Sequence, residues 1–191
     1  TLAASSHNTQ PWRFRIADHA IHIVPDFTRR LPIVDPDDAH LLRSLGCAAE
    51  NLVHAATAQG FVGHATVGED GSSLCVELTQ APGRTADPYY QALLHRQCNR
   101  FRYSGEALPR AVLDRIQKAG SGPGIHTLLF VGERAQHGFI DYLRAGNEAQ
   151  LGDPDFVSEL IASMRFNSAD EELNKDGLAS RVFGKPALPK W

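Results

Sequence analysis

Residues 35–60, DPDDAHLLRSLGCAAENLVHAATAQG, carry the clearest structural pattern in the sequence. Apolar residues recur at intervals of three or four, which places them on one face of a helix; they are Leu41, Leu45, Ala48, Leu52 and Ala56. Asp35 is a suitable N-cap, Pro36 suits a first turn, and Gly60 supplies a stop. We therefore expect a buried central helix, whose small side chains at positions 46, 48 and 49 let a neighbouring backbone approach closely.

Two β-hairpins are expected to flank this helix. Residues 12–16 alternate apolar side chains with arginines, and Ile21-His22-Ile23-Val24 follows a short polar turn; alternation on both sides of this break predicts two antiparallel strands with one buried face. Residues 62–67 and 74–78 flank the sequence Glu69-Asp70-Gly71-Ser72, which is a hairpin signal.

The remainder of the chain alternates helical and extended patterns less regularly. The patterns predict helices at about 87–97, 109–119, 134–150 and 154–165, and a strand at 125–131. From Asn167 onwards no periodicity is visible, which is typical of a long loop or an extension lying on another surface. This order of elements predicts an α+β protein and not a doubly wound sheet.

Composition narrows the class of protein. The 191 residues are enough for one domain or two small halves, and a net charge of −3 gives no basic field to attract nucleic acid or a membrane surface. The longest purely apolar run, 128–131, is far shorter than the roughly 20 residues of a membrane span. Three scattered cysteines argue against a disulfide scaffold or zinc ribbon and favour a reducing compartment, so we expect a cytoplasmic protein.

Residues 5–10, SSHNTQ, form a dense cluster of short polar side chains. The amides of Asn8 and Gln10 carry donors and acceptors that can pair with the edge of a pyrimidine or flavin ring. The alternative is an ordinary helix end followed by a turn. No G-x-S-x-G elbow surrounds Ser5 or Ser6, so the sequence does not indicate a serine hydrolase. The nine histidines show no metal-ligand spacing either.

A second polar segment, residues 95–103, holds three arginines within seven positions. Arginine side chains grip phosphate groups through two parallel hydrogen bonds, and Arg96 and Arg100 are spaced to converge on one anion. The alternative is a solvated helix end, where cations complement the helix dipole. The glycine-rich residues 120–124 precede an expected strand, so they do not match a phosphate-binding loop.

Together these segments resemble a known family. Residues 4–14, ASSHNTQPWRF, are similar to the A-P-S-S-x-N-x-Q-P-W-x-F signature of the FMN-dependent nitroreductase superfamily, and in particular of its Acg-like branch, in which two nitroreductase-like halves are fused. Residues 46–56, GCAAENLVHAA, resemble that family's central helix. Residues 27–32 and 184–191 also look Acg-like.

The resemblance implies an FMN site. It implies that Ser5, Ser6 and Asn8 approach the isoalloxazine ring, with Gln10 as a further candidate. Arg96, Cys98 and Arg100 match the spacing of the family's R-x-S-x-R phosphate motif, with a thiol in place of the usual hydroxyl. The flavin carries the chemistry in this family, so no catalytic side chain is assigned.

The resemblance also implies an organisation and an activity. We expect a nitroreductase-like α+β fold with a central helix, in which residues 1–85 form a first half, 86–166 begin a second half, and 167–191 form a lid-like extension. The chain would then be part of a longer protein, as a homodimer or a pseudo-dimer of fused halves. The implied function is electron transfer from NAD(P)H through FMN to nitro or quinone-like acceptors. The alternative is a non-catalytic protein that sequesters the flavin under its lid.

Overall fold

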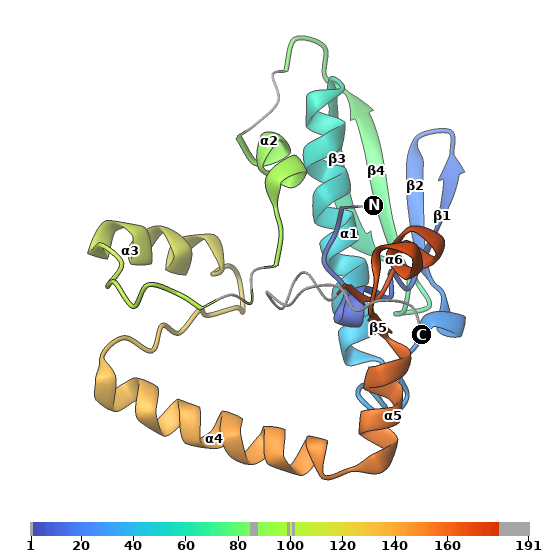
Figure 1. Cartoon of the computed structure of the whole chain (residues 1–191). Coiled ribbons are helices and arrows are strands. Elements are labelled where there is room, and N and C mark those ends of the chain that lie inside the picture. The colour runs from blue at the N-terminus through green and yellow to red at the C-terminus, as the bar shows by residue number, and fades with distance from the viewer. Residues whose placement is uncertain (1, 85–87, 99, 101, 180–191) are drawn as a thin grey trace. The chain divides into compact units, whose positions relative to one another are not determined.

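The computed structural model describes residues 2–84, 88–98, 100 and 102–179, and it is an α+β structure (Figure 1). The helices are α1 (Ala39–Ala58), α2 (Pro88–His95), α3 (Arg110–Ala119), α4 (Glu133–Leu151), α5 (Pro154–Ala162) and α6 (Ser168–Asn174), with 3-10 helices η1 (Ser6–Asn8) and η2 (Phe27–Arg29). The strands are β1 (Trp12–Ala17), β2 (Ala20–Pro25), β3 (Phe61–Val67), β4 (Leu74–Gln80), β5 (Met164–Arg165) and β6 (Leu178–Ala179).

The chain divides into two compact units. The first combines Thr1–Arg100 with Ser158–Trp191, and the second is Phe101–Val157. In the first unit, four antiparallel strands form one sheet in the order β1-β2-β4-β3, and β5 pairs with β6 in a separate parallel pair. The two hairpins expected from the sequence are therefore confirmed, and β2 pairs with β4 to join them.

Helix α1 packs on this sheet, chiefly on β3 and also on β2 and β4 (Figure 1). Leu45 of α1, Ile23 of β2 and Val76 of β4 are completely buried at the centre of the contact. A Cβ at Gly63 of β3 would lie 3.2 Å from the Cα of Val53, so the missing side chain is what allows the close approach of strand and helix. The expected burial of the central helix is thus confirmed. The expectation at Gly46 was wrong, because Gly46 is exposed with open space around it.

The start of α1 differs from the sequence-based expectation. The helix begins at Ala39, with Asp38 in a left-handed conformation before it, and not directly after Asp35. Asp35 still satisfies the open end, because its buried carboxylate accepts hydrogen bonds from the backbone N–H groups of His40 and Leu41 at 2.9 to 3.0 Å. Asp35, which is separated from the helix by a turn, therefore accepts the N–H groups of the first turn as an adjacent N-cap residue would.

The first hairpin is less buried than its alternation predicts. Trp12 is buried at the start of β1, but Phe14 is 41% exposed and Ile16 is 81% exposed. Strand β1 lies at the edge of the sheet, where it pairs with β2, and α1 covers mainly the other strands. The period-two pattern correctly predicted the strand, but the prediction that its whole apolar face is buried was wrong.

Three expectations in the C-terminal half also need correction. Residues 125–131 do not form a strand; they make one isolated bridge, between Gly122 and Ile125, because the described residues provide no strand to pair with them. Helix α5 ends at Ala162 and not at 165. The described residues after Asn167 are not all irregular, since Asn167 accepts a hydrogen bond from the N–H of Asp170 and starts α6. The rest of the expected extension, including the Acg-like residues 184–191, lies outside the described residues.

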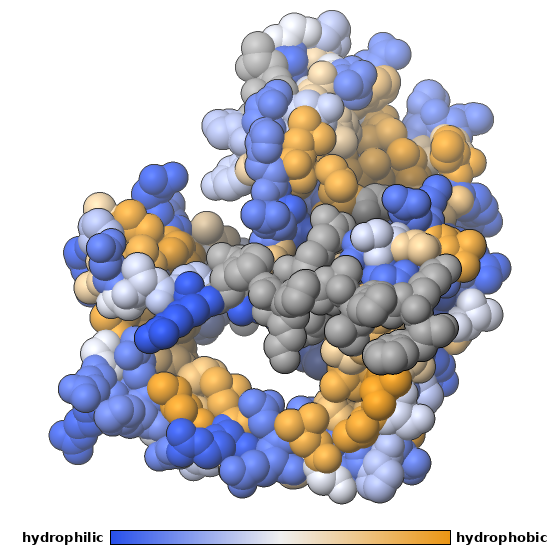
Figure 2. Space-filling model, viewed as in Figure 1, coloured by the Kyte–Doolittle hydropathy of each residue, from blue (hydrophilic) through white to orange (hydrophobic). Residues whose placement is uncertain are grey.

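Most apolar side chains of the second unit are exposed, and Figure 2 shows them over α3 and α4. Phe139, Tyr142 and Leu143 of α4 are 45%, 83% and 50% exposed. None of the helices in the described residues combines the length and the apolar character that a membrane span requires.

Asp26 fixes the corner where β2 leads into η2. Its carboxylate accepts two hydrogen bonds from the Arg13 guanidinium of β1, at 2.9 and 3.0 Å, and another from the Thr28 hydroxyl at 2.6 Å. The hydrogen bonds from Arg13 and then Thr28 lower the pKa of Asp26 from 3.8 to about 2. These hydrogen bonds need the ionised carboxylate, so the stability of this corner depends on pH.

The depressed pKa of Asp26 predicts a specific loss of stability in acid. A carboxylate whose pKa is lower in the folded state stabilises the fold above its unfolded pKa of about 3.9, and this contribution disappears as the pH falls towards 2. We expect urea unfolding of the wild type to lose stability between pH 4 and pH 2 more steeply than that of Asp26→Asn. The exposed Asp37→Asn is the control and should keep the wild-type slope. Equal slopes for wild type and Asp26→Asn would contradict the prediction.

Candidate functional site

The N-terminal loop before β1 adopts an unusual backbone conformation. His7, Asn8 and Gln10 have φ angles of 45°, 55° and 52°, so three of its residues are left-handed without being glycine. Each such residue carries a conformational penalty of order 1–3 kcal/mol and persists only where the surrounding structure imposes it. Strain of this kind is concentrated at functional sites, which makes the loop a candidate for function.

Hydrogen bonds within the loop and to α1 hold this conformation. The backbone N–H of Asn8 donates to the Ser5 carbonyl at 3.0 Å, and the N–H of Gln10 donates to the Ser5 hydroxyl at 3.0 Å. The N–H of Ser6 donates to the Ser44 hydroxyl of α1 at 3.4 Å. Since Ser44 is buried in α1, the loop is anchored to the central helix.

A segment distant in the sequence, at residues 175–179, is hydrogen-bonded to the loop. Asn8 Nδ2 donates to the Gly177 carbonyl at 3.1 Å, and the N–H of Gly177 donates to the Asn8 carbonyl at 3.2 Å. Gln10 Nε2 donates to the Lys175 carbonyl at 2.7 Å. Residues 175–179, which we call the C-terminal strap, are therefore bonded to the two amide side chains expected to contact a ligand.

Asp176 ties the strap to the rest of the first unit. Its carboxylate pairs with Arg165 of β5 at 2.6 Å and with Arg29 of η2 at 3.2 Å. Arg29 also donates to the Thr9 carbonyl at 2.9 Å. Arg165 and Asp176 are largely buried, with side chains 16% and 20% exposed, so this pair is shielded from solvent more than a surface salt bridge is.

The loop, the strap and the arginine segment after α2 line one cavity of about 200 Å³. Its described lining residues are Ala3, Ala4, Ser5, His7, Asn8, Arg96, Cys98, Arg100, Gly177, Leu178 and Ala179. Five of the seven site residues expected from the sequence are therefore brought together, although about 90 residues separate the two motifs in the chain. Ser6 and Gln10 do not line this cavity; they support the loop and the strap.

The charge of the cavity favours an anion. Two arginines and no carboxylate are found among its described lining residues. Arg96 donates from Nε and Nη2 to the Leu2 carbonyl at 3.3 and 3.1 Å, and its Nη1 lies 3.8 Å from Cys98 Sγ. These contacts hold the Arg96 side chain beside the cavity. The thiol is a weak hydrogen-bonding group, so Arg96 and Arg100 carry most of the attraction for an anion.

His7 lines the same cavity and was not among the expected site residues. Its Nδ1 is buried and has no hydrogen-bond partner among the described residues. Burial lowers the pKa of His7, the nearby Glu159 opposes this shift, and Arg100 and His40 reinforce it. The sequence placed His7 inside the polar cluster, but the spacing gave no indication that its Nδ1 would be buried.

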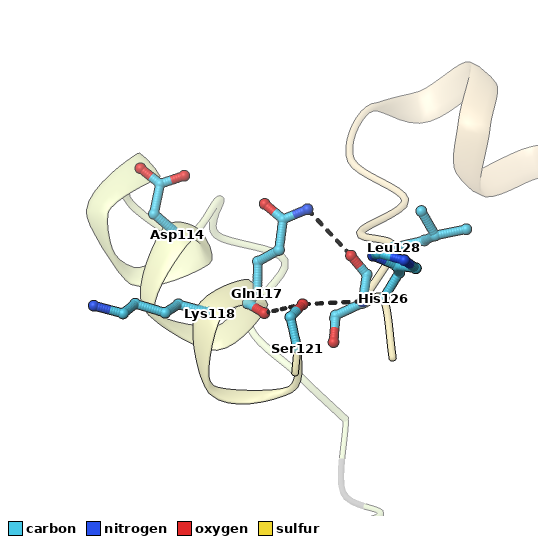
Figure 3. A pocket seen from close by; sticks show the side chains of 7 residues that line it. Asp114, Gln117, Lys118, Ser121, His126 and Leu128 are labelled. Carbon is cyan, nitrogen blue, oxygen red and sulfur yellow. Dashed lines mark hydrogen bonds between the residues drawn. The ribbon is translucent and has the colours of Figure 1, made fainter. Parts of the chain in front are cut away.

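A second cavity lies in the other unit, where α3 meets residues 121–128 (Figure 3). It is larger, at about 440 Å³, and Asp114, Lys118 and His126 are among the side chains that line it. Several of its polar groups already bond to one another: Gln117 Nε2 donates to the Thr127 carbonyl at 3.1 Å, and the Ser121 hydroxyl donates to the Gln117 carbonyl at 2.7 Å. The lining is largely exposed, so this cavity lacks the desolvation that strengthens binding.

Comparisons with known proteins add no identification. No model of a known protein family matches the chain, and no curated protein matches it either. The described residues also contain no group of three or more His, Cys, Asp or Glu side chains arranged to hold a metal ion. The candidate site therefore depends on its geometry and chemistry.

The contacts of Gly177 predict that the strap tolerates no side chain there. Its φ is +79°, and a Cβ would lie 2.5 Å from the Ser163 carbonyl oxygen. We expect Gly177→Ala to speed amide hydrogen exchange at the Leu178 N–H, which donates to that same carbonyl at 2.8 Å. The left-handed backbone accounts for about 1–2 kcal/mol of local destabilisation, and the clash for about 1–3 kcal/mol more.

Gly71→Ala is the matched control, because Gly71 has a φ of +68° but open space around it. It should show the backbone effect alone, at the β3–β4 turn. If Gly177→Ala leaves exchange at Leu178 unchanged, the strap is not packed as described.

Proposed function

We propose that the cavity binds FMN and that the chain is an FMN-dependent oxidoreductase of the nitroreductase type. The observation that carries the proposal is the meeting of two motifs in one cavity. Ser5 and Asn8 come from the motif that resembles the flavin-binding signature, and Arg96, Cys98 and Arg100 come from the motif that resembles the phosphate clamp. A nitroreductase-like arrangement of the α+β fold belongs to the same proposal.

The described residues fit the phosphate end of this cofactor. A phosphate monoester carries about −1.5 to −2 charges at neutral pH and accepts strong hydrogen bonds from arginine. Arg96 and Arg100 supply the positive charge, and the described residues that line the cavity include no carboxylate. The buried and unpartnered Nδ1 of His7 is a further polar atom that a ligand can satisfy.

The ring end of the cofactor requires the strap to take part. The amide N–H groups of Asn8 and Gln10 already donate to the Gly177 and Lys175 carbonyls. A cavity of about 200 Å³ is also below the roughly 300–1,000 Å³ of typical small-molecule sites. We therefore infer that the strap shifts when the ring enters, which releases the two amides for the ring edge.

When bound, a flavin supplies the hydride and electron transfer, here from NAD(P)H to nitro or quinone-like acceptors. The chain's own part is to hold and shield the group. Arg96 and Arg100 neutralise the phosphate, the loop at Ser5 and Asn8 meets the ring, and the strap limits access of water. No side chain is assigned as a general acid or base.

The strap also supports a second candidate, a binding protein that sequesters the flavin. The bonds from Asn8 and Gln10, with the Asp176 pairs, hold the strap where it lines the cavity. A strap that covers the flavin after binding and does not move would exclude NAD(P)H and acceptors. The two candidates share the same site and differ in the movement of the strap.

Replacing Arg96 and Arg100 together tests whether they bind the phosphate of FMN. Because each hydrogen bond from arginine to a charged group contributes about 1.5–3 kcal/mol, we expect Arg96→Gln with Arg100→Gln to weaken FMN binding by about 100-fold or more. Binding of riboflavin, which has no phosphate, should change by less than about threefold. Fluorescence quenching of each flavin on titration with protein measures both constants.

Arg110→Gln with Arg115→Gln is the control, since it removes two exposed charges from α3 and gives the same net charge. It should leave FMN binding unchanged. Equal losses of FMN and riboflavin in the Arg96 and Arg100 variant would indicate misfolding, and unchanged FMN binding would remove both arginines from the site.

Anaerobic reduction separates the enzyme from the sequestering protein. Flavin bound to an enzyme loses its visible absorbance when NADH or NADPH is added, and flavin held under a closed cover keeps it. The FMN-loaded protein should first pass through gel filtration, so that only bound flavin is observed.

A further inference from the structure

His7 stands out among the groups of the cavity because its packing is incomplete. It occupies a left-handed backbone position next to another, Asn8, and its Nδ1 is buried with no hydrogen-bond partner among the described residues. A buried polar atom without a partner destabilises a fold by about 1–3 kcal/mol. A group that combines backbone strain with an unsatisfied nitrogen is therefore a candidate for pairing with a ligand.

The position of His7 points to the anionic end of a ligand. His7 lines the cavity together with Arg96 and Arg100, and Arg100 lies close enough to act on it electrostatically. An imidazole ring turns about its Cβ–Cγ bond with a broad, two-fold preference. Half a turn exchanges Nδ1 with a carbon, so an acceptor in the cavity can recruit the nitrogen without a change in the backbone.

We propose that His7 is a ligand-binding residue of this cavity, which donates a hydrogen bond to a phosphorylated ligand and, when protonated, adds a third positive charge beside Arg96 and Arg100. The inference rests on the proposed flavin site and deepens it, because it makes binding of the phosphate depend on the protonation of one residue. Affinity for the phosphorylated ligand then rises as the pH falls.

The groups around His7 determine the direction of this effect. In the unliganded chain, burial, Arg100 and His40 lower the pKa of His7, and Glu159 acts against them. Glu159 is held in place by accepting hydrogen bonds from the backbone N–H groups of Ile33 and Val34, at 3.1 and 2.8 Å. A phosphate in the cavity adds negative charge, which raises the pKa of His7, so the proton and the ligand bind cooperatively.

The test compares FMN binding by wild type and His7→Asn at pH 8 and pH 6. Asparagine tolerates the left-handed backbone and does not titrate in this range. We expect the ratio of the two affinities, wild type over variant, to rise about three- to tenfold on going from pH 8 to pH 6. The second ionisation of the phosphate, near pH 6, affects both proteins alike and cancels in the ratio. With riboflavin the ratio should stay constant.

Two control variants identify the group responsible. His64→Gln removes an exposed histidine from β3 and should behave as the wild type. His40→Gln removes the other histidine that acts on His7, and its affinity for FMN should still rise relative to that of His7→Asn between pH 8 and pH 6. If His40→Gln loses the pH dependence of FMN binding and His7→Asn keeps that of the wild type, the assignment to His7 is overturned.

A direct titration avoids dependence on one variant. The NMR signals of the His7 ring, assigned by their loss in His7→Asn, should titrate at a higher pH when FMN is present. A titration midpoint that FMN leaves unmoved, or an affinity ratio that stays flat while FMN binding still needs Arg96 and Arg100, overturns the role of His7 alone. Failure of the wild type to bind either flavin overturns the proposed function together with it.

Discussion

The packing of α1 on the antiparallel sheet is the contact on which the rest of the first unit depends. Leu45, Ile23 and Val76 are fully buried in it, and burial of one such side chain contributes about 1.5–3 kcal/mol. Gly63 allows β3 to approach the helix closely. The same helix presents Ser44 to the N–H of Ser6, so the position of the candidate site follows from the core.

On this base, the N-terminal loop is held between the core and the strap. The first turn of the loop is anchored to α1, and Asn8 exchanges two hydrogen bonds with Gly177. Asp176 then pairs with arginines from two other elements, η2 and β5. These contacts offset the strain of three left-handed residues. A loop held in this way has an ordered backbone before a ligand binds, which lowers the entropic penalty of binding.

The sequence predicted the parts of the fold that local patterns determine. The three- and four-residue spacing around Leu45 predicted α1, and the Asp70-Gly71 turn predicted the second hairpin. The predictions that Ile16 is buried and that residues 125–131 form a strand were wrong. Both properties depend on what covers or pairs with the segment and not on the segment's own alternation. Local pattern carries no information about such neighbours.

In the candidate site, too, local sequence patterns predicted some features, and others depend on contacts between distant segments. The polar loop and the arginine segment were visible as motifs, and their meeting in one cavity is compatible with the expected flavin site, which stays a prediction. The bond between Asn8 and Gly177 joins positions 169 residues apart, and no local pattern of the sequence indicates it. His7 was missed for a related reason, since the burial of its Nδ1 is set by the groups that fold around the loop.

A map of amide chemical-shift changes in the ¹⁵N-labelled protein, recorded as FMN is added, tests directly whether the two motifs form one flavin site. A single flavin site predicts saturable changes in three separate stretches: residues 3–8, the arginine segment at 96–98 and 100, and residues 177–179 of the strap. Changes confined to one of these stretches, or centred on the α3 cavity at Gln117 and Ser121, would contradict a single flavin site built from the two motifs.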